Sequence, residues 1–375
     1  MNRDASDWFA TAGRIEALEV AELDARLVAA MQARAAGAPP ERVDFHVPTF
    51  KAFSTSEIKG CGKSAWPAVS ITGANCKLQC DHCKAKILEP MIAARTPDEL
   101  WRVVNEQVAA GAQGMLLTGG SNHRDEVEYD PFYATIGRIK DAFPSFRIAM
   151  HTALVSHEAA QRIEAAGADV AMLDVIGAQD TIRQVYHLKR PVADFEASLA
   201  HLTGTSLKVV PHVVIGLHYG RLLGEWNALE IVARHRPDAL VLVVVMPFYA
   251  PRQRPFETVP SRTVGRFFLD ARERLPGLPL LLGCARPPGR TKVEIDAYAV
   301  MAGLNGIAHP SDGTVELAMR LGRDARVSPA CCSIAIGDEV LACDDGTAAI
   351  EVDVDDYVRR EASGRGLRGI PVVAG

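Results

Sequence analysis

Short apolar runs alternate with amphipathic segments along most of the chain, a pattern typical of α/β proteins. The apolar runs predict eight buried strands, at residues 68–72, 114–118, 147–151, 170–175, 208–215, 239–246, 280–284 and 306–308. The amphipathic segments predict eight helices, at residues 97–110, 131–143, 157–166, 192–202, 225–234, 264–275, 293–302 and 315–321. Eight strand–helix repeats in this order favour a (β/α)8 TIM-type barrel. A doubly wound open sheet is the alternative, because a single sequence does not give the strand order.

The pattern divides the chain into three regions. Residues 1–60 hold a helical pattern over residues 15–35, which ends at Gly37 and the following prolines, and then an extended arm. Residues 61–322 hold the strand–helix repeats. Residues 323–375 form a cysteine-bearing tail with a predicted hairpin, whose strands are residues 333–342 and 348–354.

Composition and charge limit the classes of partner. The chain has 375 residues, of which 48% are hydrophobic and 23% charged, as in ordinary globular proteins. Its formal net charge is -5, which argues against a nucleic-acid partner, because such proteins normally carry a basic face. No apolar run reaches the roughly 20 residues of a membrane-spanning helix, and the N-terminus lacks a signal-like core. We therefore expect a cytoplasmic protein without a membrane partner.

Three cysteines follow the first predicted strand at close spacing. Cys76, Cys80 and Cys83 lie in the segment ITGANCKLQCDHCKAKIL. Thiolates are the usual protein ligands of iron–sulfur clusters, and three of them leave one iron of a four-iron cluster open for chemistry. Barrel active sites lie at the C-terminal ends of the strands, where this loop is expected. A structural zinc knuckle is the alternative, but zinc normally takes a fourth ligand nearby, and the motif offers only His82.

The spacing of these cysteines resembles the signature of the radical S-adenosylmethionine (SAM) superfamily. The resemblance implies a catalytic [4Fe–4S] cluster whose open iron binds SAM and, once reduced, cleaves it to a 5′-deoxyadenosyl radical. It also implies that His82 lies near the adenine of SAM. Gly119, Gly120 and Ser121 resemble the superfamily's glycine-rich segment at the methionine part of SAM, with Ser121 in place of the usual acidic residue.

Further candidate binding residues lie at other predicted strand ends. His151 and Asp174 close the third and fourth strands, and polar groups at a barrel mouth are often ligands, although His151 could equally be a core histidine. Gly216 and Glu225 resemble the turn near the adenine in the biotin-synthase-like branch. Arg286 resembles the arginine that this branch places near a second cluster.

The remaining cysteines predict an auxiliary iron–sulfur cluster. Its expected ligands are Cys284, Cys331 and Cys332, with Cys61 or Cys343 as a further candidate, and its expected role is to donate sulfur to the substrate. The alternatives are buried thiols that act as small hydrophobic side chains, or a disulfide in the tail. A disulfide between adjacent cysteines would be strained.

The motifs taken together resemble a narrower family. The segments FHVPTF, LLTGGSN, DVIGAQDTI, VYHLKR, LGCARP and the CCS tail occur in order between residues 45 and 333. This order is similar to the lipoyl synthases of the two-protein type. The resemblance implies sulfur insertion into an octanoyl chain on a lipoyl-carrier protein. The implied partners are that carrier, a second radical SAM protein and an electron donor such as ferredoxin or flavodoxin. A biotin-synthase-like sulfurtransferase and a non-catalytic iron–sulfur electron carrier are the alternatives.

Overall fold

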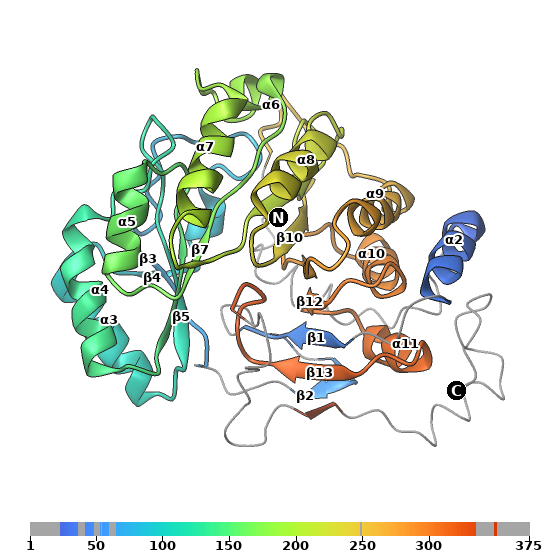
Figure 1. Cartoon of the computed structure of the whole chain (residues 1–375), viewed down its shortest axis with the longest axis horizontal. Coiled ribbons are helices and arrows are strands. Elements are labelled where there is room, and N and C mark those ends of the chain that lie inside the picture. Colours follow the sequence, from blue (N-terminus) through green and yellow to red (C-terminus); the bar gives the residue numbers. More distant parts are fainter. Residues whose placement is uncertain are drawn as a thin grey trace.

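The computed structural model describes residues 23–36, 42–48, 53, 55–59, 65–247, 250–334 and 349–350. Two six-stranded parallel sheets form the centre of the molecule, with helices on their outer side (Figure 1). The alternation of strands and helices predicted from the sequence is confirmed.

The first sheet contains the strands between Ala68 and Val209. Its order is β4–β3–β5–β6–β7–β8. The strands are β3 (Ala68–Ser70), β4 (Ile92–Ala93), β5 (Gly114–Thr118), β6 (Arg147–His151), β7 (Val170–Met172) and β8 (Lys208–Val209). The helices beside them are α3 (Pro97–Ala109), α4 (Tyr133–Ala142), α5 (His157–Ala165), α6 (Gln179–Gln184) and α7 (Val192–Thr203). Short 3-10 turns, η2 (Lys86–Leu88) and η3 (Asp130–Phe132), lie between them.

The second sheet continues the pattern and adds two further strands. Its order is β13–β1–β12–β11–β10–β9. The strands are β1 (Val43–His46), β9 (His212–Ile215), β10 (Leu240–Val244), β11 (Leu280–Leu282), β12 (Gly306–Ala308) and β13 (Ala325–Ser328). The helices are α2 (Ala25–Ala35), α8 (Glu225–His235), α9 (Ser261–Arg274), α10 (Arg290–Met301) and α11 (Thr314–Arg320).

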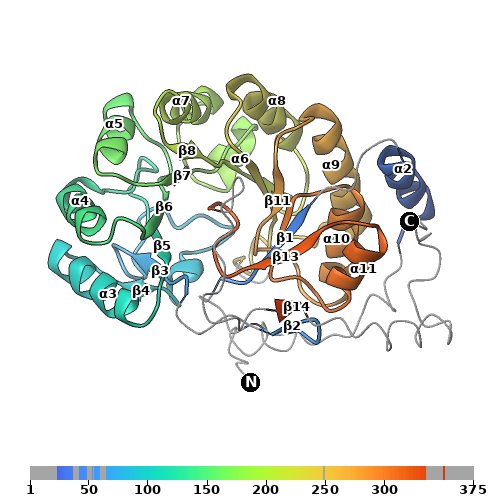
Figure 2. The same cartoon turned by 60° about the horizontal axis from the view of Figure 1, so that its bottom comes forward.

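The two sheets meet where the chain that follows β7 pairs with the first residue of β9. The Leu173 carbonyl accepts the His212 N–H, and the His212 carbonyl accepts the Val175 N–H, both at 2.8 Å. A parallel bridge between Asp174 and His212 marks this junction. The sheets thus form one curved wall, and Figure 2 shows the helices along its outer side.

Both terminal regions contribute to this wall. The predicted N-terminal arm contains β1, which pairs in parallel with β12 on one side and β13 on the other. Of the expected N-terminal helix, α2 lies inside the predicted range, and residues before 23 lie outside the described part. In the tail, β14 (Ala349–Ile350) pairs antiparallel with β2 (Ile58–Lys59). The rest of the predicted hairpin, from residue 335 to 348 and after 350, lies outside the described residues.

The hydrophobic core has two layers, one on each side of the wall. Alternate strand residues such as Ile148 and Leu242 pack against the helices. Their neighbours Ala149 and Val241 point to the inner side, where they pack with Trp66 and Cys332. The segment that follows β13 therefore turns into the lumen of the barrel (Figure 2). Among the described residues, no helix combines the length and apolar character needed to cross a bilayer.

Candidate active site

A cavity of about 320 Å³ opens at the C-terminal ends of the strands. Its volume is in the range of small-molecule binding sites. All six described cysteines line it, in two groups. One group is Cys76, Cys80 and Cys83 of the motif, and the other is Cys284, which follows β11, with Cys331 and Cys332 from the segment after β13. The sequence-based groups of cysteines thus meet at one cavity.

The motif loop is shaped by short-range hydrogen bonds at the end of β3. The Ser70 hydroxyl donates to the Gly73 carbonyl at 2.7 Å, and the Thr72 hydroxyl donates to the Asn75 carbonyl at 2.8 Å. The Gly120 N–H donates to the Thr72 hydroxyl at 2.7 Å. A Cβ on Gly120 would lie 2.5 Å from the Cys76 Cα, so only glycine allows the loop after β5 to approach the motif this closely.

Cys80 lies close enough to Cys83 and Cys76 for their charges to affect its ionisation. Burial, followed by the negative charges of Cys83, Asp125 and Cys76, raises the pKa of Cys80. Burial alone would also raise the pKa of Cys83, but the charge and hydrogen bond of His82 outweigh it and lower that pKa. Converging thiolates in a partly buried loop suit a cationic metal group, which relieves their repulsion. The donor set therefore fits an iron–sulfur cluster.

Asp81 fixes the motif loop to two other segments and to Lys84 within the loop. Its carboxylate is almost fully buried and accepts hydrogen bonds from Lys84 at 2.6 Å, His187 at 3.0 Å and the Tyr219 hydroxyl at 2.9 Å. Burial alone would raise the pKa of Asp81, but these hydrogen bonds lower it below its usual value. The charged form of Asp81 therefore holds the loop between Cys80 and Cys83 in place.

His82 and Asp125 face the same cavity from opposite loops. The His82 ring lies 5.1 Å from the Tyr186 ring. Burial alone would lower the pKa of His82, but the negative charges around it, Cys83 first, raise it. Burial raises the pKa of Asp125 to about 6, although a hydrogen bond with Ser121 acts in the opposite direction. Asp125 has no sequence motif, and its only signal is its position four residues after Ser121.

His151 and Asp174 are brought together, and His212 joins them. The His151 Nε2 atom lies 3.8 Å from an Asp174 oxygen, and the His151 and His212 ring centroids are 5.4 Å apart. Burial alone would raise the pKa of Asp174, but the neighbouring histidines, His151 first, hold it well below its usual range. Burial and the charge of His151 lower the pKa of His212 to about 4. His212 lies in the predicted fifth strand and was not a predicted site residue.

In the second group, Cys331 and Cys332 affect each other's ionisation. The Ser333 hydroxyl lies 3.3 Å from the Cys331 sulfur. A hydrogen bond from Cys332 lowers the pKa of Cys331, and burial opposes this shift only in part. The same hydrogen bond, together with burial and the charges of Cys331 and Cys284, raises the pKa of Cys332. Cys61 and Cys343, the other predicted candidates, lie outside the described residues.

Three predicted binding residues lie behind the cavity rather than on its lining. Arg286 is buried and donates to Asp296 at 2.6 Å and to the carbonyls of Gly283 and His309 at 2.8 and 2.9 Å. Glu225 accepts hydrogen bonds from the backbone N–H groups of four residues: Gly216, Leu217, Leu223 and Gly224. Gly216 has φ +79° and packs against Val259. These three residues thus stabilise the loops and helix starts around the cavity, and none of them lines it.

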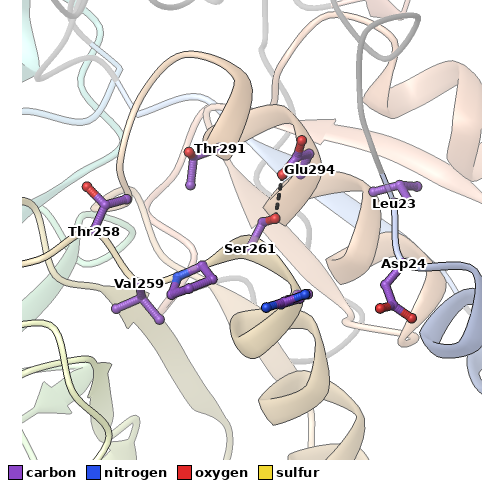
Figure 3. A pocket seen from close by; sticks show the side chains of 9 residues that line it. Leu23, Asp24, Thr258, Val259, Ser261, Thr291 and Glu294 are labelled. Atoms are coloured by element: carbon purple, nitrogen blue, oxygen red, sulfur yellow. Dashed lines mark hydrogen bonds between the residues drawn. The ribbon is translucent and has the colours of Figure 1, made fainter.

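A second hollow, of about 430 Å³, lies on the outside of the barrel (Figure 3). It is lined by the segment before α2 and by the starts of α9 and α10, with Ser261 hydrogen-bonded to Glu294. No cysteine lines it, and it lies away from the motif thiols.

Comparison with known proteins supports the fold. No family model and no curated protein sequence matches the chain. The crystal structure of HydG, a maturase of the [FeFe]-hydrogenase, is 15% identical, with a TM-score of 0.55 over 85% of this chain and 72% of HydG. Methylornithine synthase (PylB) is 14% identical, with a TM-score of 0.50 over 96% of this chain and 93% of PylB. The chain therefore shares the parallel (β/α) barrel fold of these two proteins.

Proposed function

We propose that the protein is a radical SAM enzyme that inserts sulfur into an octanoyl chain carried on a lipoyl-carrier protein. The observation that carries the proposal is the meeting of two groups of three cysteines at one cavity. One group suits a SAM-cleaving cluster, and the other suits a sulfur source beside the substrate. The fold shared with HydG and PylB supports the first part of the proposal.

Cys76, Cys80 and Cys83 would hold the [4Fe–4S] cluster. When bound, this cluster supplies one electron to SAM. The residues of the chain have the tasks of holding the cluster and orienting SAM beside it. His82 and Asp81 support this role from within the motif, because His82 favours the thiolate of Cys83 and Asp81 fixes the loop.

SAM would lie against the loop that follows β5. Gly119, Gly120 and Ser121 line the cavity beside Cys76, and Asp125 lies in the same loop. Ser121 cannot supply the negative charge that its position usually holds, whereas the Asp125 carboxylate can. We assign Asp125 to the ammonium group of SAM and His82 to the vicinity of the adenine.

The substrate chain would occupy the apolar side of the cavity. Met172, Val214, Val241 and Val243 line this side from strands β7, β9 and β10. An octanoyl chain has only unactivated C–H bonds, and apolar side chains around it exclude water from a reactive radical. Cys284, Cys331 and Cys332 would hold an auxiliary iron–sulfur cluster as the sulfur source. The proposed partners are the octanoylated carrier, a second radical SAM protein and a ferredoxin or flavodoxin.

Mass spectrometry of an octanoylated carrier after anaerobic turnover tests the proposal. The native protein, with its partner protein, should add sulfur to the carrier and release 5′-deoxyadenosine. The C284A/C331A/C332A variant should still cleave SAM but add no sulfur, whereas the C76A/C80A/C83A variant should do neither. Sulfur added to dethiobiotin and not to the carrier would favour a biotin-synthase-like enzyme. Reduced protein that carries a cluster but forms no 5′-deoxyadenosine would indicate an electron carrier.

A further inference from the structure

His151, Asp174 and His212 form a compact cluster that none of the proposed steps uses. Their nitrogen and carboxylate ligand atoms all lie within 4.8 Å of one another. They come from the ends of neighbouring strands: His151 ends β6, Asp174 follows β7, and His212 begins β9. The backbone bridge between Asp174 and His212 fixes two of the three positions. Side chains on such a scaffold are held more firmly than side chains on loops.

The cluster has unused coordinating atoms. The Nδ1 atom of His212 is buried and has no hydrogen-bond partner among the residues that the structure describes. One Asp174 oxygen accepts a hydrogen bond from the Tyr186 hydroxyl at 3.2 Å, and the other lies 3.8 Å from the His151 Nε2 atom, which is too long for a hydrogen bond. A buried polar atom without a partner is costly unless a ligand or water satisfies it.

Two imidazoles and one carboxylate are the donor set of mononuclear metal sites with open positions. Bonds of about 2.1 Å would bring neighbouring ligand atoms to about 3 Å from one another. The present separations are therefore slightly wide, and small side-chain rotations would close them. The Tyr186 hydroxyl already orients the carboxylate, as a supporting hydrogen bond does in many metal sites.

We propose that His151, Asp174 and His212 together bind one divalent first-row transition-metal ion, separate from both groups of cysteines. The three residues supply one face of the coordination shell, and the remaining positions face the cavity. An ion there could bind an oxygen donor of a substrate. This proposal rests only on the three side chains, and it does not depend on whether the enzyme inserts sulfur.

Binding of Mn²⁺ to the anaerobically reconstituted protein tests this site. Mn²⁺ favours nitrogen and oxygen ligands over thiolates. Its room-temperature electron paramagnetic resonance signal falls when the free ion binds. The measurement uses no SAM and no substrate, so its outcome is independent of turnover. The native protein should bind one Mn²⁺ per chain saturably, and the H151Q, D174N and H212Q variants should each weaken binding at least tenfold.

Matched controls separate this site from others. The H157Q and D130N variants change a histidine and an aspartate outside the cavity lining and should bind Mn²⁺ as the native protein does. Visible absorption of the cluster and the thermal midpoint, measured on the same samples, should show that the three site variants are folded. The proposal is overturned if native protein shows no saturable binding, or if all three site variants bind normally. It is also overturned if the C284A/C331A/C332A variant alone abolishes binding, because the ion would then lie on thiols.

Discussion

Among single residues, Asp81 has the most unusual environment in the motif loop. A carboxylate this deeply buried is normally stabilised by several partners, and Asp81 has three hydrogen-bond donors from three segments. Two of these, His187 and Tyr219, lie 106 and 138 residues away in the chain. These long-range hydrogen bonds therefore hold the backbone between Cys80 and Cys83 in one position.

Replacement of Asp81 by Asn should loosen this loop. The loss of charge-assisted hydrogen bonds should lower the free energy of unfolding by about 2 kcal/mol. It should also lower the iron content after reconstitution. Urea unfolding and iron analysis measure the two effects. Asp180→Asn removes an exposed ion pair with Arg183 and should change stability by less than about 0.5 kcal/mol. Equal iron content in D81N and native protein would contradict the assigned role.

Asp125 should act on SAM and not on the cluster. The D125N variant should keep the cluster absorption, because Asp125 is not a thiol ligand. It should bind SAM about 10- to 100-fold more weakly, which corresponds to the loss of one charge-assisted hydrogen bond. Equilibrium dialysis of labelled SAM measures the affinity. The S121A variant keeps the carboxylate and should lose less affinity. Unchanged binding in D125N would remove Asp125 from the SAM site.

At the scale of whole elements, the local pattern predicted most strands. It did not predict the break between β8 and β9 or the strand β1 in the N-terminal arm. Strands β5, β6 and β12 have the predicted bounds. The predicted strand over residues 208–215 is split into β8 and β9 at Pro211, which has no N–H to donate to a neighbouring strand. Where β1 lies, the sequence predicts only an extended arm, because the partner strands of β1 come more than 250 residues later in the chain. Its length of four residues gives little local signal.

His46 of β1 should make stability depend on pH. The side chain is fully buried, and burial lowers its pKa to about 4, with only partial compensation from the charge of Asp44. The unfolded chain therefore takes up a proton at a higher pH than the folded protein. The stability due to neutral His46 is present above pH 6.5 and is lost as the pH falls toward 4, by at most about 3 kcal/mol.

The H46F variant isolates this contribution. Its free energy of unfolding should decline less than that of the native protein between pH 6.5 and pH 4, since phenylalanine does not titrate. Other acidic and basic groups change in both proteins, so the difference between the two curves is the relevant quantity. Parallel curves over this range would show that His46 does not control the acid response.

At the scale of the whole molecule, the site arises because the two sheets curve around one lumen. The motif cysteines lie in the loop after β3 of the first sheet, Cys284 follows β11 of the second, and the segment after β13 brings Cys331 and Cys332 to the same cavity. The sequence predicted the motif group from its spacing, and the second group from the expected position of the remaining cysteines at the barrel mouth. The sequence did not predict that Asp125 and His212 line the same cavity, because that proximity depends on how the strand ends and loops are arranged in space. Nor could it show that Arg286 forms a buried ion pair with Asp296 and so does not reach the cavity.

Trp66 lies on the inner side of the wall and lines the cavity. It is only 2% exposed and packs with inward-facing residues of both sheets, including Met172 and Leu281. Its ring also lies so close to Gly114 that a Cβ there would be 2.3 Å from it.

The W66A variant should therefore leave a large void in the lumen and lower the free energy of unfolding by about 3–5 kcal/mol. The W226A variant is a matched control, because Trp226 is half-buried and packs on Phe267 outside the lumen. Urea unfolding should rank W66A well below W226A, whereas equal stability would mean that the two sheets do not depend on the lumen side chains for their contact.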